Sequence, residues 1–216
     1  MNKIHKGKKM SKKKIILILA AAIIIVGCAY LFKTGIIVVN LHKTALKDPV
    51  SGQAVTQEDL ANKSAHDLYT DAIELNKKGD YDQASAFLNS AMQKDNNETN
   101  VNVLRELAVS YYNLKKYLDA IATYLKITEI NPENTSAFNE LGNVYRDSGD
   151  KAKAEESYRK AIETDMSYIL AYNNLAMMFV QDNNVDAAKN VIQDGLNKNQ
   201  NNSELEKIMK SLEVIN

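Results

Sequence analysis

The chain repeats itself with a period of about 34 residues, and this periodicity restricts its fold more than any other feature. Four aligned apolar residues follow one another at separations of 36, 34 and 34 residues: Leu68, Leu104, Phe138 and Tyr172. Three further columns keep the same spacing: Ala72, Ala108, Gly142 and Ala176; Leu75, Tyr111, Tyr145 and Phe179; Ala84, Ala120, Ala154 and Ala188. Such a period indicates an array in which one supersecondary unit stacks on the next.

Each unit predicts two amphipathic helices. In the third unit, the apolar positions of the first half recur at steps of three and four: Phe138, Leu141, Gly142 and Tyr145. The second half repeats the pattern with Ala154, Tyr158 and Ala161. The halves of the four units are separated by short turn sequences: Gly79-Asp80, Lys115-Lys116, Gly149-Asp150 and Asn183-Asn184. Glycine or asparagine there can adopt the left-handed conformation that ends a helix, and aspartate can cap the next one. Each unit is therefore predicted to be a helical hairpin.

Gly142 stands inside a predicted helix, where glycine costs roughly 0.8–1 kcal/mol relative to alanine. Its column holds only alanine or glycine, and so does the column of Ala154 on the partner helix. We expect the two columns to face each other and to let the helices of a hairpin approach closely. This interpretation predicts that Gly142→Ala is tolerated, whereas Gly142→Leu overpacks the contact.

Over residues 65–200 the chain resembles the tetratricopeptide repeat family. The sequence LGNVY of residues 141–145 and the pair Asn131-Pro132 match the family signature well. The chain departs from the family pattern at Asp71, where leucine is usual, and at Gly195, where alanine is usual. The proline slot of the family also holds other residues in three repeats: Asn96, Met166 and Gln200.

The resemblance implies an all-α solenoid of helical hairpins over residues 56–216. We place about four repeats at 65–98, 101–134, 135–168 and 169–202, followed by a capping helix at 203–215. The first helix is expected to begin early, after the capping residue Thr56, and to run on through Leu60 and Leu68. The apolar stripe of the cap comprises Leu205, Ile208, Met209 and Leu212, and its charged remainder gives the solenoid a polar end.

In this family the first helices line the concave side of the solenoid. Spacing on those helices selects candidates for a peptide-binding groove: Tyr69, Arg105, Tyr112, Asn139, Asn143, Arg146, Asn173 and Met177. An asparagine side chain can both donate to and accept from the backbone of an extended peptide. The three asparagines resemble a short asparagine ladder of the kind seen in some grooves of the family, or they form a solvated polar face in an asparagine-rich chain. The tyrosines and Met177 are candidate anchors for apolar side chains, or they pack within the solenoid.

The N-terminal residues predict a membrane segment. Residues 1–14 form a basic flank with seven lysines, and residues 15–32 contain no charge. Eighteen helical residues span about 27 Å, which is just enough to cross the hydrocarbon core of a bilayer. Lysines on this flank hold the N-terminus in the cytoplasm. We therefore expect a single-pass signal anchor in a bacterial cytoplasmic membrane, a linker at 33–55, and the repeat domain outside.

A secretory signal is the alternative for the same segment. Ile25, Val26, Gly27 and Cys28 resemble the bacterial lipobox, in which cleavage before the cysteine frees it for acylation. This alternative makes Cys28 the lipidation site of a lipid-anchored protein. The apolar residues that follow Cys28 favour the uncleaved anchor. The bacterial source is inferred from this motif and from the bias toward Lys, Ile and Asn.

Composition restricts the function of the repeat domain. Eight lysines and no acid fall in residues 1–33, which leaves 19 basic against 27 acidic residues, a balance of −8, in the rest of the chain. An acidic body argues against nucleic acid as its partner. One cysteine and three scattered histidines show no metal-ligand spacing, and no Ser or Cys nucleophile sits at helical spacing from the pair His66 and Asp67. No glycine-rich loop suits a phosphate.

These observations predict a membrane-tethered adaptor that binds a protein or peptide partner through its groove, with no enzymatic activity, metal or cofactor. The alternative is a structural subunit of an envelope, secretion or pilus assembly that acts by self-association or docking.

Overall fold

The structure is a computed structural model that describes residues 55–94 and 99–215. These residues form ten α-helices and no strand, within one compact unit that spans residues 45–216. The predicted basic flank, membrane segment and Cys28 lie outside the described residues, as does all but the end of the predicted linker. Across residues 55–94 and 99–215, no helix has both the length and the apolarity that a membrane crossing requires.

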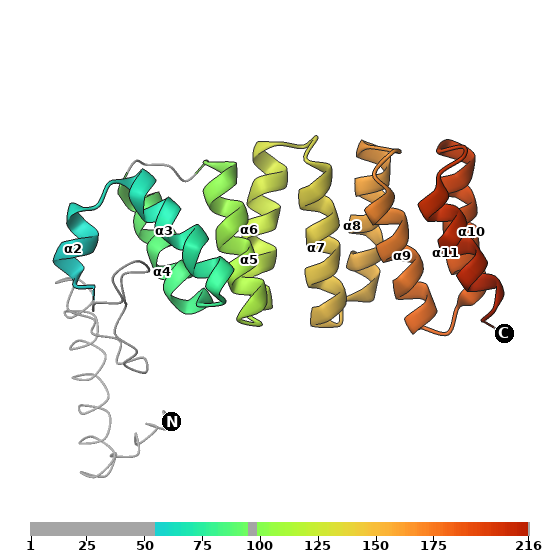
Figure 1. The fold of residues 1–216 in the computed structure, drawn as a ribbon, viewed down its shortest axis with the longest axis horizontal. Helices are drawn as coiled ribbons and strands as arrows, with labels where there is room; N and C mark the ends of the chain where they lie inside the picture. The colour runs from blue at the N-terminus through green and yellow to red at the C-terminus, as the bar shows by residue number, and fades with distance from the viewer. Residues whose placement is uncertain (1–54, 95–98, 216) are drawn as a thin grey trace, which may run out of the picture. The chain divides into compact units, whose positions relative to one another are not determined.

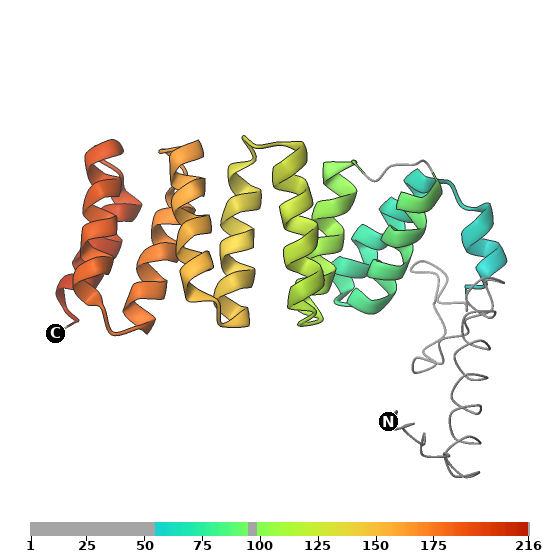
Figure 2. The same ribbon diagram turned by 180° about the vertical axis from the view of Figure 1, so that it is seen from behind.

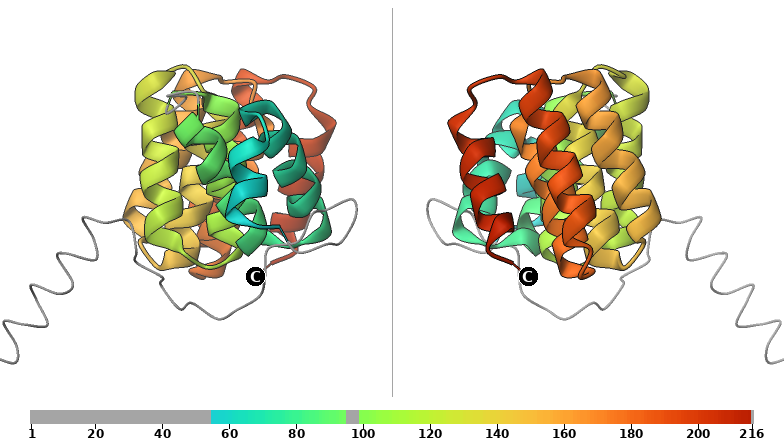
Figure 3. Two further views of the ribbon diagram at one scale, coloured as in Figure 1. Left: turned by 90° about the vertical axis from the view of Figure 1, so that its left-hand side faces the viewer. Right: turned by 90° about the vertical axis from the view of Figure 1, so that its right-hand side faces the viewer.

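Eight of these helices form four antiparallel hairpins that follow one another in chain order (Figures 1 and 2). The hairpins are α3 (Ala65–Lys78) with α4 (Tyr81–Lys94), α5 (Val101–Asn113) with α6 (Tyr117–Ile130), α7 (Thr135–Ser148) with α8 (Lys151–Thr164), and α9 (Ile169–Gln181) with α10 (Val185–Lys198). The short helix α2 (Gln57–Asn62) precedes them, and α11 (Ser203–Glu213) follows. Figure 3 shows the two ends of the row, with α2 in front at one end and α10 and α11 at the other. The prediction of an all-α solenoid of helical hairpins is confirmed.

The four hairpin turns share one backbone conformation. A residue one or two positions after each first helix is left-handed, with φ of 78° at Gly79, 58° at Lys115, 92° at Gly149 and 57° at Asn183. The next N–H then donates to a carbonyl five residues back, as Asp150 does to Tyr145 at 2.9 Å. This closure satisfies carbonyls at the helix end that would otherwise lack a partner. Lys115 adopts the conformation although its side chain disfavours it by about 1–2 kcal/mol.

The start of the domain differs from the predicted continuous helix. Thr56 does cap a helix, but α2 ends at Asn62 and the backbone is extended at Lys63. Ser64 then caps α3 by accepting from the N–H of Asp67, whose carboxylate accepts from the Ser64 N–H in return. This second capping box, four residues before the aligned Leu68, explains the break because it stabilises a new helix start.

The break also explains the departure at Asp71. The Lys63 ammonium lies 2.6 Å from the Asp71 carboxylate, and the two side chains are only 25% and 17% exposed. Lys63 also lies over the Phe87 ring, 5.6 Å from its centroid. The first repeat thus replaces an apolar contact with an ion pair that the end of α2 supplies, and Leu60 of α2 is itself buried.

Buried apolar side chains form two clusters that meet in α5. Val103 and Leu107 belong to the N-terminal cluster, and Leu104 and Ala108 to the C-terminal one. At the far end, Leu205 and Leu212 of α11 are buried, while its glutamates and lysines are exposed. The core is therefore a continuous strip between the two layers of helices.

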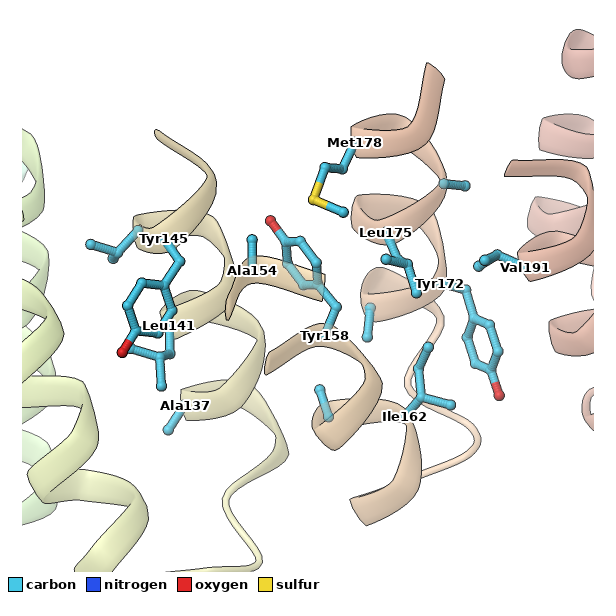
Figure 4. Close-up of a cluster of buried hydrophobic side chains, with 14 of the residues drawn as sticks. Ala137, Leu141, Tyr145, Ala154, Tyr158, Ile162, Tyr172, Leu175, Met178 and Val191 are labelled. Carbon is cyan, nitrogen blue, oxygen red and sulfur yellow. The ribbon is translucent and has the colours of Figure 1, made fainter. Parts of the chain in front are cut away.

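Gly142 makes room for an aromatic ring. A Cβ atom on this residue would lie 2.6 Å from two ring carbons of Tyr158 on α8, which is shorter than real Cβ contacts. Tyr158 is completely buried, and its ring lies between the ribbons of α7 and α9 in Figure 4. Its hydroxyl donates to Asn143 at 2.8 Å, so the ring is fixed at both ends. The expectation that Gly142→Ala is tolerated was therefore wrong, because the nearest neighbour is Tyr158 rather than the alanine column.

We expect Gly142→Ala to lower the free energy of unfolding by about 1–3 kcal/mol, because the added methyl group overpacks against the fixed ring of Tyr158. Thermal melting of the full chain in a mild detergent, followed by circular dichroism, measures this effect. An unchanged melting temperature for this variant would contradict the packing argument.

The second repeat supplies the control for this prediction. There Ala108 and Val109 replace Gly142 and Asn143, so the side chain beside the alanine offers no acceptor to a tyrosine hydroxyl. Asn143→Val should release the ring of Tyr158 and reduce the cost of Gly142→Ala. A double-mutant cycle measures the coupling between the two changes, and strictly additive costs would show that the hydrogen bond does not fix the ring.

Candidate functional site

The candidate groove lies on one side of α3, α5, α7 and α9, called here the first-helix face. Its eight predicted residues differ in exposure. Arg105 and Met177 are exposed, and Met177 is 49% accessible. Five residues are partly buried: Tyr69, Tyr112, Asn143, Arg146 and Asn173. Asn139 is buried, with 1% exposure.

The burial of Asn139 corrects its predicted role. Asn174 of α9 donates through Nδ2 to Asn139 Oδ1 at 2.9 Å, and Asn139 Nδ2 lies 3.3 Å from Glu140 Oε1. Both ends of the amide are therefore engaged, the oxygen by α9 and the nitrogen by Glu140 of α7 itself. Asn139 has neither the exposure nor the free donor and acceptor that a peptide backbone would require.

Asn143 belongs to the same network. It accepts from the Tyr158 hydroxyl at 2.8 Å and donates through Nδ2 to Glu140 Oε2 at 3.1 Å. The carboxylate of Glu140 thus accepts one bond from each of the two asparagines. We call Asn139, Glu140, Asn143, Tyr158 and Asn174 the amide network; it connects α8 to α7 and α7 to α9.

A second polar contact connects α5 to α7. The Tyr112 hydroxyl donates to the Asp147 carboxylate, which also accepts from Arg146 Nε at 2.8 Å. Burial, and then the bond to Asp147, raises the pKa of Tyr112 to about 12. Burial alone would raise the pKa of Asp147, but the bonds from Arg146 and Tyr112 outweigh it, so the pKa of this carboxyl is below its ordinary value. Tyr112 and Arg146 are thus brought together through Asp147, which was not among the predicted residues.

A third contact connects α3 to α5. Asn76 Nδ2 lies 3.2 Å from the carbonyl oxygen of Glu106, and Asn76 Oδ1 accepts from Ser110 Oγ at 2.8 Å. Successive first helices are therefore held together by polar side chains as well as by their apolar cores.

Sequence reasoning missed the partners in these contacts, although a signal for them was present. The paired residues are separated by about one repeat: 34 residues for Asn76 and Ser110, and 35 residues both for Tyr112 and Asp147 and for Asn139 and Asn174. Polar pairs at the repeat period are therefore candidates for contacts between successive first helices.

The remaining accessible residues of the first-helix face define what a partner can touch. Leu170 and Met177 are 50% and 49% exposed, and they lie two turns apart on α9. Arg105 donates through Nη2 to Asn102 Oδ1 at 3.3 Å and its Nε lies 3.9 Å from Glu106 Oε1, while 49% of its side chain remains exposed. This combination of an arginine with exposed apolar side chains is typical of protein interfaces.

The opposite side of the row, formed by α4, α6, α8 and α10, is called here the second-helix face. It contains two grooves of about 410 Å³ and 400 Å³. The first is lined by Leu125, by α8, and by Phe138, Leu141 and Tyr145 of α7. The second repeats this arrangement one unit later, with Tyr172, Leu175 and Phe179 of α9. Within the described residues, no three His, Cys, Asp or Glu side chains gather as they would around a metal ion.

The amide network predicts different outcomes for two neighbouring asparagine positions. We expect Asn139→Ala to lower the free energy of unfolding by about 1–3 kcal/mol, because Asn174 and Glu140 lose a buried partner. Asn173→Ala, at the same slot of the next repeat, should change it by less than about 0.5 kcal/mol, since no contact between helices depends on it. Thermal melting of both variants makes the comparison, and equal costs would contradict the structural role of Asn139.

Family models identify the repeats independently. Residues 75–141 match one tetratricopeptide repeat model, and residues 135–165 match a second. Among solved structures, the chain is similar to a thermophilic tetratricopeptide repeat protein of Thermus thermophilus, with a TM-score of 0.56 and 17% identity. That likeness covers 71% of this chain and 83% of the other, and it concerns the fold alone.

Curated relatives are similar over a limited part of their length. Protein CTR9 homolog of Arabidopsis thaliana is 25% identical over 155 residues, which are 70% of this chain but 13% of that protein. Heat shock protein STI1 of Saccharomyces cerevisiae is 32% identical over 88 residues, which are 41% of this chain and 15% of that protein. The family models and the geometry of the described helices agree on the repeats. Residues 75–165 are therefore tetratricopeptide repeats, and the described residues form an all-α solenoid of the tetratricopeptide type.

Proposed function

We propose that this chain is an adaptor that binds a protein or peptide segment on its first-helix face. The observation that carries the proposal is the exposure of Arg105, Leu170 and Met177 on first helices whose Asn76, Tyr112, Asn139 and Asn143 side chains are engaged within the solenoid. The tetratricopeptide fold supports a role in protein–protein interaction, and interfaces of this kind are enriched in arginine, methionine and aromatic residues.

The amide network changes the mode of recognition that the sequence predicted. Asn139 and Asn143 are engaged within the solenoid, so a ladder of asparagines does not grip the backbone of the partner. Recognition then depends on apolar side chains of the partner that pack against Leu170 and Met177, and on a carboxylate or carbonyl that pairs with Arg105. Selectivity for such a partner comes from its side chains.

A photoreactive amino acid at Met177 tests this proposal. In the native membrane, the full chain carrying it should crosslink to a partner, and Arg105→Ala with Leu170→Ala should reduce that product at least about fivefold. The same photoreactive residue at Gln193, exposed on α10 of the second-helix face, serves as the control. Equal crosslinking of the same protein from both positions would contradict binding on the first-helix face. So would crosslinking from Met177 that is unchanged by Arg105→Ala with Leu170→Ala.

We further propose that residues 15–32 tether the adaptor to a bacterial cytoplasmic membrane, with the repeats on the outer side. The support is the uncharged length of this segment and the lysines before it. Tethering raises the local concentration of a partner near the bilayer, so weak binding by the solenoid suffices.

Two separate measurements test the proposed membrane attachment. The full chain should remain with membranes after extraction at high pH, whereas a chain without residues 15–32 should become soluble, since the apolar segment supplies the membrane affinity. The mass of the mature N-terminus then distinguishes an uncleaved anchor from a chain that begins with lipid-modified Cys28. Complete extraction of the full chain at high pH would rule out both forms of attachment.

A further inference from the structure

The helix α6 carries an apolar stripe that no other part of the described chain covers. Leu118 is 83% exposed and Leu125 is 40% exposed. The two leucines are seven residues apart, so they lie on the same side of α6, two turns from each other. Leu125 also lines the first groove of the second-helix face.

Comparison of the repeats shows that hairpin packing does not require these leucines. The slot of Leu118 holds Asp82, Ala152 and Asp186 in the other three repeats. The slot of Leu125 holds Asn89, Arg159 and Gln193. An aspartate in the first turn of a helix also stabilises the helix through its interaction with the helix dipole, whereas a leucine makes no such interaction. The apolar stripe of α6 therefore costs solubility without helping the fold, which indicates a contact outside the chain.

The groove beside this stripe has an apolar floor and a charged rim of three basic residues and two glutamates. Phe138, Leu141 and Tyr145 form the floor, and Lys153 lies over the Tyr145 ring, 5.4 Å from its centroid. A protruding leucine and an apolar hollow thus occur on the same face. This is the self-complementary arrangement that a two-fold contact between identical chains requires.

The charges of this face also suit a second copy of the chain. The helix α8 has four basic residues against three glutamates, whereas α6 has Asp119 and Glu129 against Lys126. The two helices are therefore of opposite sign and neutral together, although the chain after residue 33 has an acidic excess of eight. Identical acidic bodies therefore repel each other less at this face than elsewhere.

We propose that a second copy of this chain docks here, with α6 of each copy lying over the groove between α6 and α8 of the other. Both helices begin at the lower edge of the row in Figure 1. A two-fold axis parallel to the helices, between α6 and the groove, then brings Leu118 of each copy to the end of the other copy's groove where Tyr145 and Lys153 lie. The contact leaves the first-helix face open, so it goes beyond the proposed function and does not depend on it.

The double variant Leu118→Asp and Leu125→Gln tests the contact. Both new residues occur at the same slots of sister repeats, at Asp82 and Gln193, so the fold should be retained, and circular dichroism checks this. For the full chain in detergent, sedimentation should show a dimer whose dissociation constant rises at least about tenfold in the variant. Val214→Gln is the control, because Val214 is equally exposed at 83% but lies after α11.

A disulfide experiment tests the geometry of the same contact. Cys28 is the only cysteine, so Cys28→Ser provides a background without thiols. One tagged copy with Leu118→Cys and a second, differently tagged copy with Lys153→Cys should form a mixed disulfide, whereas Val214→Cys with Lys153→Cys should not.

Several results would overturn the proposal. The first is a chain that stays monomeric. The second is a dimer that persists in the variant with both α6 substitutions, as would be the case if the chains associated through residues 15–32. A third is a monomeric chain in which those substitutions weaken binding to a different protein, because the stripe would then belong to another partner.

Discussion

Close contact between the two helices of each hairpin is the constraint on which the rest of the structure depends. The alanines of the repeated columns are 0–1% exposed, among them Ala72, Ala108, Ala154 and Ala188. Small residues at these positions let the helix backbones approach, so larger side chains on either side can interlock with the next hairpin. In the third repeat the approach is so close that Tyr158 occupies the space of a missing Cβ on Gly142.

Because packing is assigned to a few repeated columns, the outward positions are free to differ, and their differences carry the functional information. Leu118 and Leu125 are informative because five of their six sister slots hold polar or charged residues. Asn139 is informative for the opposite reason: it stands at a slot that resembles a binding surface and is buried. The repeats of a solenoid can therefore be compared with one another. A residue type shared by all repeats reflects packing, and a residue that differs from its sister slots indicates a separate role.

The periodicity predicted the hairpins, their turns and the apolar columns, because these depend on contacts within one unit or at one fixed spacing. It did not predict the break after Asn62, which the local capping box of Ser64 and Asp67 determines. The periodicity also could not predict the role of Asn139, because an asparagine on the edge of a helix points either to solvent or to the next repeat. The direction of the side chain depends on how α7 and α9 are positioned relative to each other. Asn139 bonds to Asn174 and not to its neighbour Asn173, so a difference of one residue decides which asparagine makes the contact.

The polar contacts between first helices connect stability to binding. A repeat array is stabilised by each unit and by its contacts with the next, so Asn76, Tyr112 and Asn139 each strengthen one such junction. Rigid junctions keep Arg105 on α5 and Met177 on α9 at a fixed separation, which lowers the ordering cost when one partner contacts both. If two chains also join through α6 and α8, and if residues 15–32 hold them on a membrane as proposed, each assembly presents two such faces beside the bilayer. A partner with two binding segments, or two partners held on one membrane, would then be retained far longer than by a single solenoid, although each contact remains weak.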